Sequence, residues 1–148
     1  MKKSILILAL ILLGFGANAM VGEKTLSYVK TGNEVYFGQD LKMGLFNFKV
    51  IDSEGTVTKI PNRDVVAYTH NARTYEYLPV MCKTNGIECY AMMELIKVKS
   101  GLNLYRYTGF DDRHQKYEYF IFKNGEFHLR IDQQNAKTVL PFFGIKVV

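Results

Sequence analysis

The stretch YFIFKNGEFHLR, residues 119–130, carries the pattern from which a fold can be worked out. Asn124-Gly125 lies between two alternating apolar runs, and Asn-Gly accepts the positive φ angles of a two-residue type I′ hairpin turn. A turn there places Phe122 opposite Phe127. The other predicted pairs are Phe120 with Leu129, Ile121 with His128, and Tyr119 with Arg130. One face of the hairpin is then apolar and the other mixed, which is typical of an antiparallel sheet with one wet side.

Three further turns follow from the same reasoning. DSEG at 52–55 predicts a three-residue hairpin with Gly55 in the left-handed region, joining LFNFKVI to TVTKI. KSG at 99–101 predicts a hairpin, and HNAR at 70–73 predicts a weaker turn. The pairs expected from these last two turns are Glu94 with Arg106, Ile96 with Leu104, and Tyr68 with Tyr75. The chain therefore folds back on itself repeatedly.

The two cysteines, Cys82 and Cys89, flank a second candidate Asn-Gly corner in CKTNGIEC. A two-residue turn at Asn85-Gly86 places them directly opposite each other, where Cα atoms lie about 4.5–5.5 Å apart, within reach of a disulfide. Lys83 would then face Glu88. We expect a structural disulfide rather than a redox-active pair, because redox pairs favour Cys-x-x-Cys spacing and a lowered thiol pKa.

Two segments and one proline limit the strand assignment. Residues 91–99 have apolar spacing compatible with a helix, but a strand joins the neighbouring hairpins without a break, and we favour the strand. Pro79 lacks an N–H, so its strand should be an edge or bulged there. Asp132 can cap a short helix through QQNAKTVL, and Pro141 should stop it. The last residues, PFFGIKVV, then pack as a strand or tail.

The sequence thus predicts an all-β protein with a single antiparallel meander of about eight or nine strands and one short C-terminal helix. Such a sheet must curl, so we expect a small barrel or a strongly bent sheet. A two-layer β-sandwich is the alternative.

The N-terminus has the features of an export signal. Lys2 and Lys3 precede the apolar run 5–13, and Ala17-Asn18-Ala19 resembles a signal-peptidase site. The run is shorter than the roughly 20 apolar residues that span a bilayer. We expect a signal peptide over 1–19, a single β-rich domain over 20–148, and a periplasmic or extracellular location, with no transmembrane segment after cleavage.

The charge distribution and the motif search point away from several functions. The chain of 148 residues has a net charge of +5, but Lys and Arg are scattered singly, so we expect no nucleic-acid partner. His70, His114 and His128 have no ligand-like spacing, so we expect no metal and no cofactor. His128 should be half-buried. The loop from Asp111 through Asp112 to His114 offers acid–base groups for a hydrolase, which ranks third among the functions considered.

Tyrosines are the remaining candidate binding residues, and we expect no catalytic ones. In YEY and YRY strings both rings share one face of a strand, and tyrosine suits partner surfaces because it combines a broad apolar ring with a polar tip. The candidate residues are Tyr75, Tyr77, Tyr105, Tyr107, Tyr117 and Tyr119. We expect a non-catalytic protein that binds an envelope protein or its own copy through an aromatic face or a sheet edge. A small-molecule carrier with a ligand in a barrel lumen is the alternative.

Overall fold

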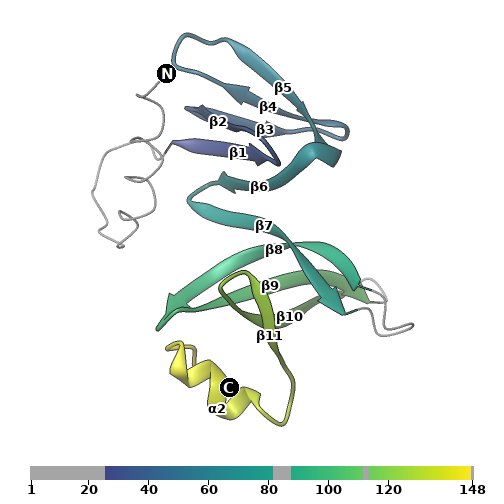
Figure 1. Ribbon diagram of the computed structural model, residues 1–148, viewed down its shortest axis with the longest axis vertical. Coiled ribbons are helices and arrows are strands. Elements are labelled where there is room, and N and C mark those ends of the chain that lie inside the picture. The colour runs from purple at the N-terminus through teal and green to yellow at the C-terminus, as the bar shows by residue number, and fades with distance from the viewer. Residues whose placement is uncertain (1–25, 82–87, 112–113, 148) are drawn as a thin grey trace.

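A computed structural model describes residues 26–81, 88–111 and 114–147 of the chain (Figure 1). The expected signal peptide at 1–19 and the Asn85-Gly86 corner lie outside these residues. Cys82 and Asp112 also lie outside them.

Within the described residues the chain forms eleven strands, a 3₁₀ turn and one short helix, and every strand pair is antiparallel. The elements are β1 Ser27–Thr31, β2 Val35–Gly38, β3 Asp40–Met43, β4 Asn47–Ile51, β5 Val57–Pro61, η1 Asn62–Asp64, β6 Val65–His70, β7 Arg73–Met81, β8 Glu88–Lys99, β9 Leu102–Asp111, β10 His114–Lys123, β11 Glu126–Ile131 and α2 Ala136–Phe142. The all-β prediction is confirmed, and residues 91–99 are strand.

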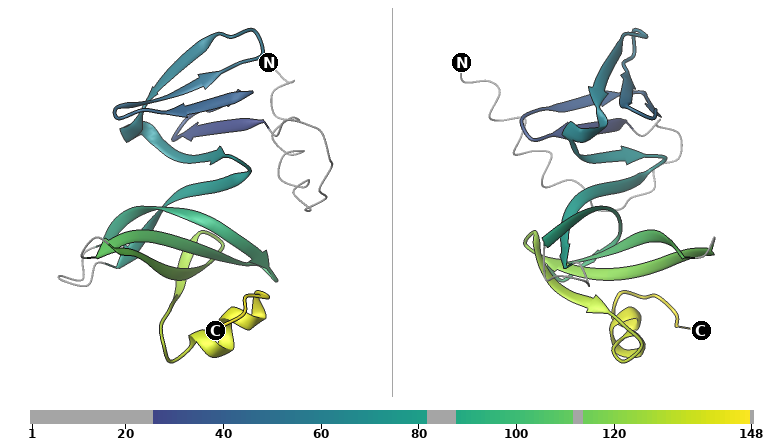
Figure 2. Two further views of the ribbon diagram at one scale, coloured as in Figure 1. Left: turned by 180° about the vertical axis from the view of Figure 1, so that it is seen from behind. Right: turned by 90° about the vertical axis from the view of Figure 1, so that its right-hand side faces the viewer.

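The strands divide into two sheets. The larger has eight strands in the order β11-β10-β9-β8-β7-β6-β1-β2, and the smaller has three in the order β3-β4-β5. From β6 to β11 the large sheet is the predicted meander, but it is not closed, because β2 and β11 form its two edges. The barrel expectation is therefore wrong. The small sheet lies against one end of the large one, which is consistent with the sandwich alternative (Figure 2).

The chain passes from the large sheet to the small one at Gly38. A Cβ built on Gly38 would lie 2.6 Å from the carbonyl oxygen of Ile51 and 2.6 Å from Cγ1 of Val50. Next to it, the backbone N–H of Gln39 donates a 2.8 Å hydrogen bond to the same carbonyl oxygen. Only glycine permits the backbone to approach another strand this closely. At this corner the chain passes from β2 in the large sheet to β3 in the small sheet with only Gln39 between the two strands.

The turn predictions are largely confirmed. Oδ1 of Asp52 accepts hydrogen bonds from the N–H groups of Glu54 (2.9 Å) and Thr56 (2.8 Å), and Gly55 has φ +83°. Asn124 and Gly125 have φ of 52° and 81°, as a type I′ turn requires. Ser100-Gly101 and Asn71-Ala72 also have positive φ at both positions. The confirmed cross-strand pairs are Phe122 with Phe127, Glu94 with Arg106, and Tyr68 with Tyr75.

The observed register differs from the predicted one near two of these turns. Between β10 and β11 the shift leaves Ile121 opposite Leu129 and Phe120 opposite Arg130. His128 is exposed, not half-buried. Between β8 and β9 the two-residue turn at Ser100-Gly101 places Leu104 opposite Lys97 instead of Ile96, and the bulge between Leu95 and Lys97 restores the predicted pair of Glu94 with Arg106. A bulge adds one residue to one strand only, so the pairs predicted from the Asn124-Gly125 turn fail past the β10–β11 bulge.

The register around the cysteines also differs from the prediction. Cys89 lies opposite Val80 and Glu88 lies opposite Met81, which is two residues away from the predicted register. The expected direct opposition of Cys82 and Cys89 is therefore wrong. Because Cys82 is outside the described residues, the disulfide itself stays a prediction. Pro79 pairs with Tyr90 on one side, while β6 stops pairing with β7 at Glu76, so Pro79 occupies an edge as expected.

The helix α2 differs from expectation at both ends. Asp132 organises the turn before the helix, where its Oδ1 accepts hydrogen bonds from the N–H groups of Gln134 (2.8 Å) and Asn135 (3.0 Å), but Asn135 occupies the N-cap position. Pro141 lies inside the helix and does not stop it. The helix ends at the buried C-cap residue Phe143, and Gly144, with φ +79°, closes it through a Schellman turn.

Three apolar clusters hold the fold. The first joins the two sheets and contains Val29, Leu41, Phe48, Val50, Ile60, Val65 and Tyr68. The second lies within the curled part of the large sheet and contains Met93, Tyr105, Phe120 and Phe122. The third holds α2 on the sheet and contains Leu104, Ile121, Leu140 and Phe143.

Candidate partner-binding surface

The six candidate tyrosines are divided between the two faces of the large sheet. Directly opposite residues share a face, and one cross-strand row joins Tyr75, Glu94, Arg106 and Tyr119. Tyr77 and Tyr117 lie two residues along their strands and share this face. Tyr105, opposite Phe120, and Tyr107 lie on the other face. A single surface containing all six rings therefore does not form.

The rings on the other face belong to the core. Tyr105 is 2% exposed, packs edge-on against Phe122, and donates a 2.6 Å hydrogen bond to Oε2 of Glu76. Burial, and then this hydrogen bond, raise the pKa of the Tyr105 hydroxyl above its ordinary value. Tyr107 packs against the same cluster. These two tyrosines are structural.

Tyr75 and Tyr119 are also partly covered, although they lie on the first face. Tyr75 stacks on Tyr68 with ring centroids 4.7 Å apart, and it packs against the cluster between the sheets. Burial, and then the neighbouring Tyr75, raise the pKa of Tyr68 to about 12. Tyr119 packs beside the helix cluster. The small sheet and α2 thus cover the two ends of this face.

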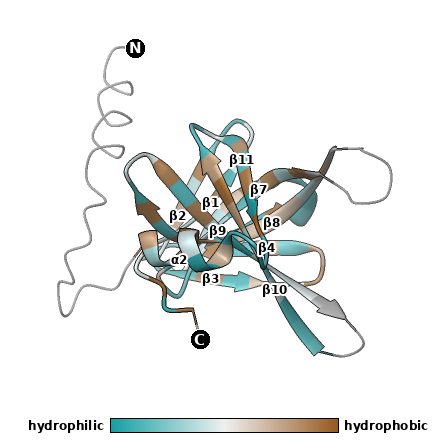
Figure 3. Cartoon of the chain, turned by 90° about the horizontal axis from the view of Figure 1, so that it is seen from below, coloured by the Kyte–Doolittle hydropathy of each residue, from teal (hydrophilic) through white to brown (hydrophobic). Residues whose placement is uncertain are grey.

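Between the parts of this face that the small sheet and α2 cover, two hairpins leave aromatic rings exposed. Strand β8 pairs with β9 only from Glu94 and Arg106 to Lys99 and Leu102. Beyond Glu94 and Arg106 the β7–β8 and β9–β10 hairpins point in different directions (Figure 3). Each hairpin presents exposed tyrosine beyond the row of Glu94 and Arg106.

Tyr77 and Tyr90 form the aromatic pair of the β7–β8 hairpin. Their ring centroids lie 5.4 Å apart at 30°, and they are 48% and 51% exposed. Tyr77 lies opposite Met92 and Tyr90 opposite Pro79, so the two rings are diagonal neighbours. Stacking orders both rings without covering them, which lowers the entropy that a partner must remove.

Tyr117 is the exposed ring of the β9–β10 hairpin. It is 46% exposed, and the guanidinium carbon of Arg106 lies 4.8 Å from its ring centroid. Arg106 in turn donates a 2.5 Å hydrogen bond to Oε2 of Glu94, which raises the pKa of Arg106. Arg73 approaches the other oxygen of Glu94 at 3.7 Å. The three charged side chains thus position the Tyr117 ring where the β7–β8 and β9–β10 hairpins begin to separate.

Tyr90 and Arg106 were missed by the sequence reasoning. Tyr90 stands alone rather than in a YxY string, and the two-residue turn assumed at Asn85-Gly86 gave it the wrong neighbours. Arg106 was identified as the partner of Glu94, but its contact with Tyr117 crosses to a third strand. Cross-strand register over three strands is the signal that could have found it.

The groups considered for catalysis lie at the end of the β9–β10 hairpin. Asp111 and His114 are opposed at the ends of β9 and β10, while Asp112 lies outside the described residues. Within the described ranges no three His, Cys, Asp or Glu residues could hold a metal ion together. In the same part of the chain, no helix is long and apolar enough to cross a membrane.

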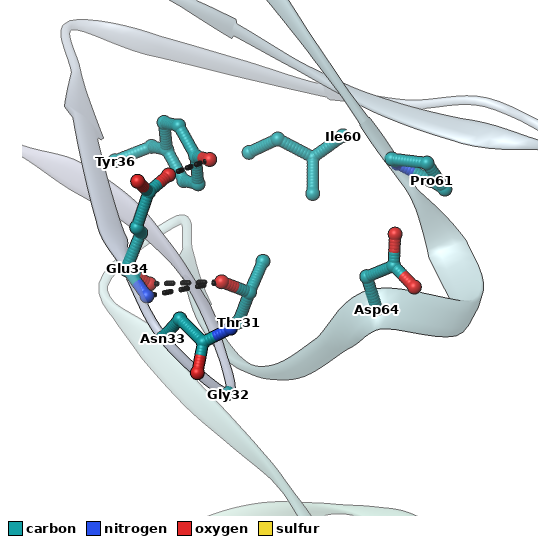
Figure 4. A pocket seen from close by; sticks show the side chains of 8 residues that line it. All are labelled: Thr31, Gly32, Asn33, Glu34, Tyr36, Ile60, Pro61 and Asp64. Carbon is teal, nitrogen blue, oxygen red and sulfur yellow. Dashed lines mark hydrogen bonds between the residues drawn. The ribbon is translucent and has the colours of Figure 1, made fainter.

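A shallow depression of about 500 Å³ lies between the β1–β2 turn and the end of β5 (Figure 4). Thr31 and Glu34 hold the turn through a 3.1 Å hydrogen bond from the Glu34 N–H to Oγ1 of Thr31. The Tyr36 hydroxyl donates a hydrogen bond to the carboxylate of Glu34. Asp64 lines the opposite side. The depression is acidic and open, unlike the apolar lumen expected of a carrier.

Comparison of the chain with protein families, with curated proteins and with solved structures finds no match in any of the three.

Proposed function

We propose that this chain is a non-catalytic, exported binding protein that holds an envelope protein through Tyr77, Tyr90 and Tyr117. The observation that carries the proposal is the exposure of these three ordered rings on one face, between the two covered ends of the sheet. Tyrosine and arginine dominate the binding energy of many protein interfaces. Arg106 lies beside them, already paired with Glu94.

Site-specific photocrosslinking in the envelope of the producing cell tests this function. A photoreactive phenylalanine derivative replaces Tyr77, Tyr90 or Tyr117 in turn, and we expect one discrete adduct common to all three positions. An adduct of twice the chain mass identifies the partner as a second copy. The control is the same replacement at Phe37, which is 50% exposed on the opposite face of the large sheet. Equal adducts at Phe37, or none at the three tyrosines, would refute the proposal.

The other two functions lack a specific supporting observation. The carrier required a closed barrel, and β2 and β11 are unjoined edges. The hydrolase required the segment from Asp111 to His114. Replacing Asp112 and His114 by Ala should leave the photocrosslinked adduct unchanged.

A further inference from the structure

A row of three lysines crosses the outer face of the small sheet. Lys42 on β3 lies directly opposite Lys49 on β4, and Lys49 lies directly opposite Lys59 on β5. All three are exposed, while Leu41, Phe48 and Ile60 on the other face are buried against the large sheet. The outer face therefore presents positive charge across its full width.

The lysine row is not neutralised within the part of the chain that the structure describes. No ion pair there involves any of the three lysines. Asp40 lies on the same face, but its Oδ1 accepts a 2.9 Å hydrogen bond from the Leu41 N–H. Like charges directly opposite one another destabilise a sheet. An anionic partner would remove this repulsion.

The turn between β3 and β4 presents apolar side chains at the end of the same sheet. Leu45 is 83% exposed, Phe46 is 75% exposed, and Met43 is 51% exposed. Leu45 and Phe46 occupy the tip of the turn, which closes through a 2.9 Å hydrogen bond from the Gly44 N–H to the Asn47 carbonyl oxygen. Figure 1 shows this turn at the outer end of the small sheet, beside η1.

Asn62 holds the exposed tip in one conformation. Its side-chain Nδ2 donates to the carbonyl oxygens of Gly44 (3.1 Å) and Leu45 (2.9 Å), and its backbone N–H donates to that of Phe46 (3.0 Å). Three consecutive carbonyl groups are thus satisfied by one residue. The hydrogen bonds satisfy the polar backbone of the tip and leave its apolar side chains projecting outwards.

We propose that the apolar tip and the lysine row together dock this protein on an anionic phospholipid membrane. Lys42 precedes Leu45 by three residues and Lys49 follows Phe46 by three, so both lie about 10 Å from the tip along their strands. An apolar tip buried by roughly 5–10 Å in the boundary between headgroups and acyl chains would bring the ammonium groups to the phosphates. The depth of the lysines matches the depth of the anionic headgroups.

The shape of the tip favours lipid over a protein partner. A two-residue turn is narrow and convex, and lipids rearrange around such a wedge, whereas a stable protein interface needs a complementary surface of about 800 Å² on each side. Arg63, next to Asn62, is paired with Asp64 at 3.6 Å and adds no uncompensated charge. This inference uses the small sheet alone and does not depend on the tyrosine surface.

Vesicle flotation tests the proposal with the full exported chain. We expect binding to vesicles of phosphatidylcholine with phosphatidylglycerol and none to phosphatidylcholine alone. Replacing Lys42, Lys49 and Lys59 by Gln should weaken binding roughly a hundredfold, since each lysine near an anionic surface contributes about fivefold. The matched control replaces exposed Lys97, Lys116 and Lys137 by Gln, with the same loss of charge, and should retain binding to within about fivefold.

Fluorescence measures the insertion of the tip directly, because the chain contains no tryptophan. Phe46→Trp should show a blue-shifted emission and quenching by brominated acyl chains when anionic vesicles are added. Phe37→Trp, at an exposed position on β2, should show neither change. Leu45→Ser with Phe46→Ser should abolish flotation while leaving the circular dichroism spectrum unchanged.

Three results would overturn the proposal. They are equal binding to neutral vesicles, full binding by the lysine variant, and an unchanged emission from Phe46→Trp on bound protein. Retention on immobilised polyglutamate without flotation on anionic vesicles would also overturn it, and would assign the lysine row to an acidic protein.

Discussion

Glu94 and Arg106 are joined across β8 and β9 by a 2.5 Å hydrogen bond at the last paired position before the two hairpins separate. The exposed fractions of the two side chains are 12% and 25%. Arg106 also lies over the ring of Tyr117. This ion pair thus joins β8 to β9 where the two hairpins begin to separate, and it positions the Tyr117 ring of the proposed binding surface.

Removing this pair should destabilise the fold more than removing a comparable exposed one. Glu94→Ala leaves the guanidinium of Arg106 half-buried without its acceptor, and we expect a loss of about 2 kcal/mol in the free energy of unfolding. Glu118→Ala breaks the 3.0 Å pair with the more exposed Arg130 and should lose less than about 1 kcal/mol. Urea denaturation measures both, and equal losses would contradict the assignment.

Tyr68 should make the protein sensitive to alkali. Burial raises its pKa from 10.0 to about 12 in the folded state, so the folded chain keeps a proton that the unfolded chain loses. Its contribution to stability is fully present below pH 10 and is lost as the pH rises towards 12.

Denaturation between these two pH values should therefore show a steeper loss of stability in the wild type than in Tyr68→Phe. Phenylalanine at exposed Tyr117 serves as the control and should retain the wild-type slope. An identical slope in all three proteins would exclude Tyr68 as the source.

Gly38 should tolerate no side chain. In Gly38→Ala the new methyl group would meet the Ile51 carbonyl oxygen and Val50 at 2.6 Å, and we expect a loss of about 1–3 kcal/mol. Gly32→Ala is the matched control, because nothing lies within 4 Å of its built Cβ, and it should change stability by less than about 0.5 kcal/mol. Thermal and urea denaturation of the two variants give the comparison.

The disulfide expected between Cys82 and Cys89 can be tested without further structure. Mass spectrometry of the protein purified without reductant should give a mass lower by two hydrogens, and alkylation without reduction should label neither cysteine. Cys82→Ser should then lower the free energy of unfolding by about 2–3 kcal/mol. Two alkylatable thiols in the unreduced protein would show that the bond is absent.

The local turns could be predicted because their chemistry is contained in a few neighbouring residues. Asp52 accepts hydrogen bonds within its own hairpin, and Asn124-Gly125 adopts the positive φ angles that its side chains permit. Where no bulge lies between the turn and the pair, the turn alone also predicts pairs such as Phe122 with Phe127 and Tyr68 with Tyr75.

Contacts between distant segments could not be read in this way. The bulges between β8 and β9 and between β10 and β11 have no signal in the turn residues. Alternation predicts that Tyr105 and Tyr107 share a face, and likewise Tyr117 and Tyr119, but not which face is covered. That outcome depends on where the small sheet and α2 pack.

The amino-acid sequence by itself determined the hairpins, the all-β class and the alternation of each strand, because these depend on backbone preferences within a few residues. The tertiary structure alone decided that β1 pairs with β6, that Gly38 carries the chain into a second sheet, and that three scattered lysines form one row. The physical reason is that burial of apolar surface is non-directional, so many arrangements of the same hairpins satisfy the pattern. Close packing between distant segments selects one of them, and with it the surfaces that remain exposed.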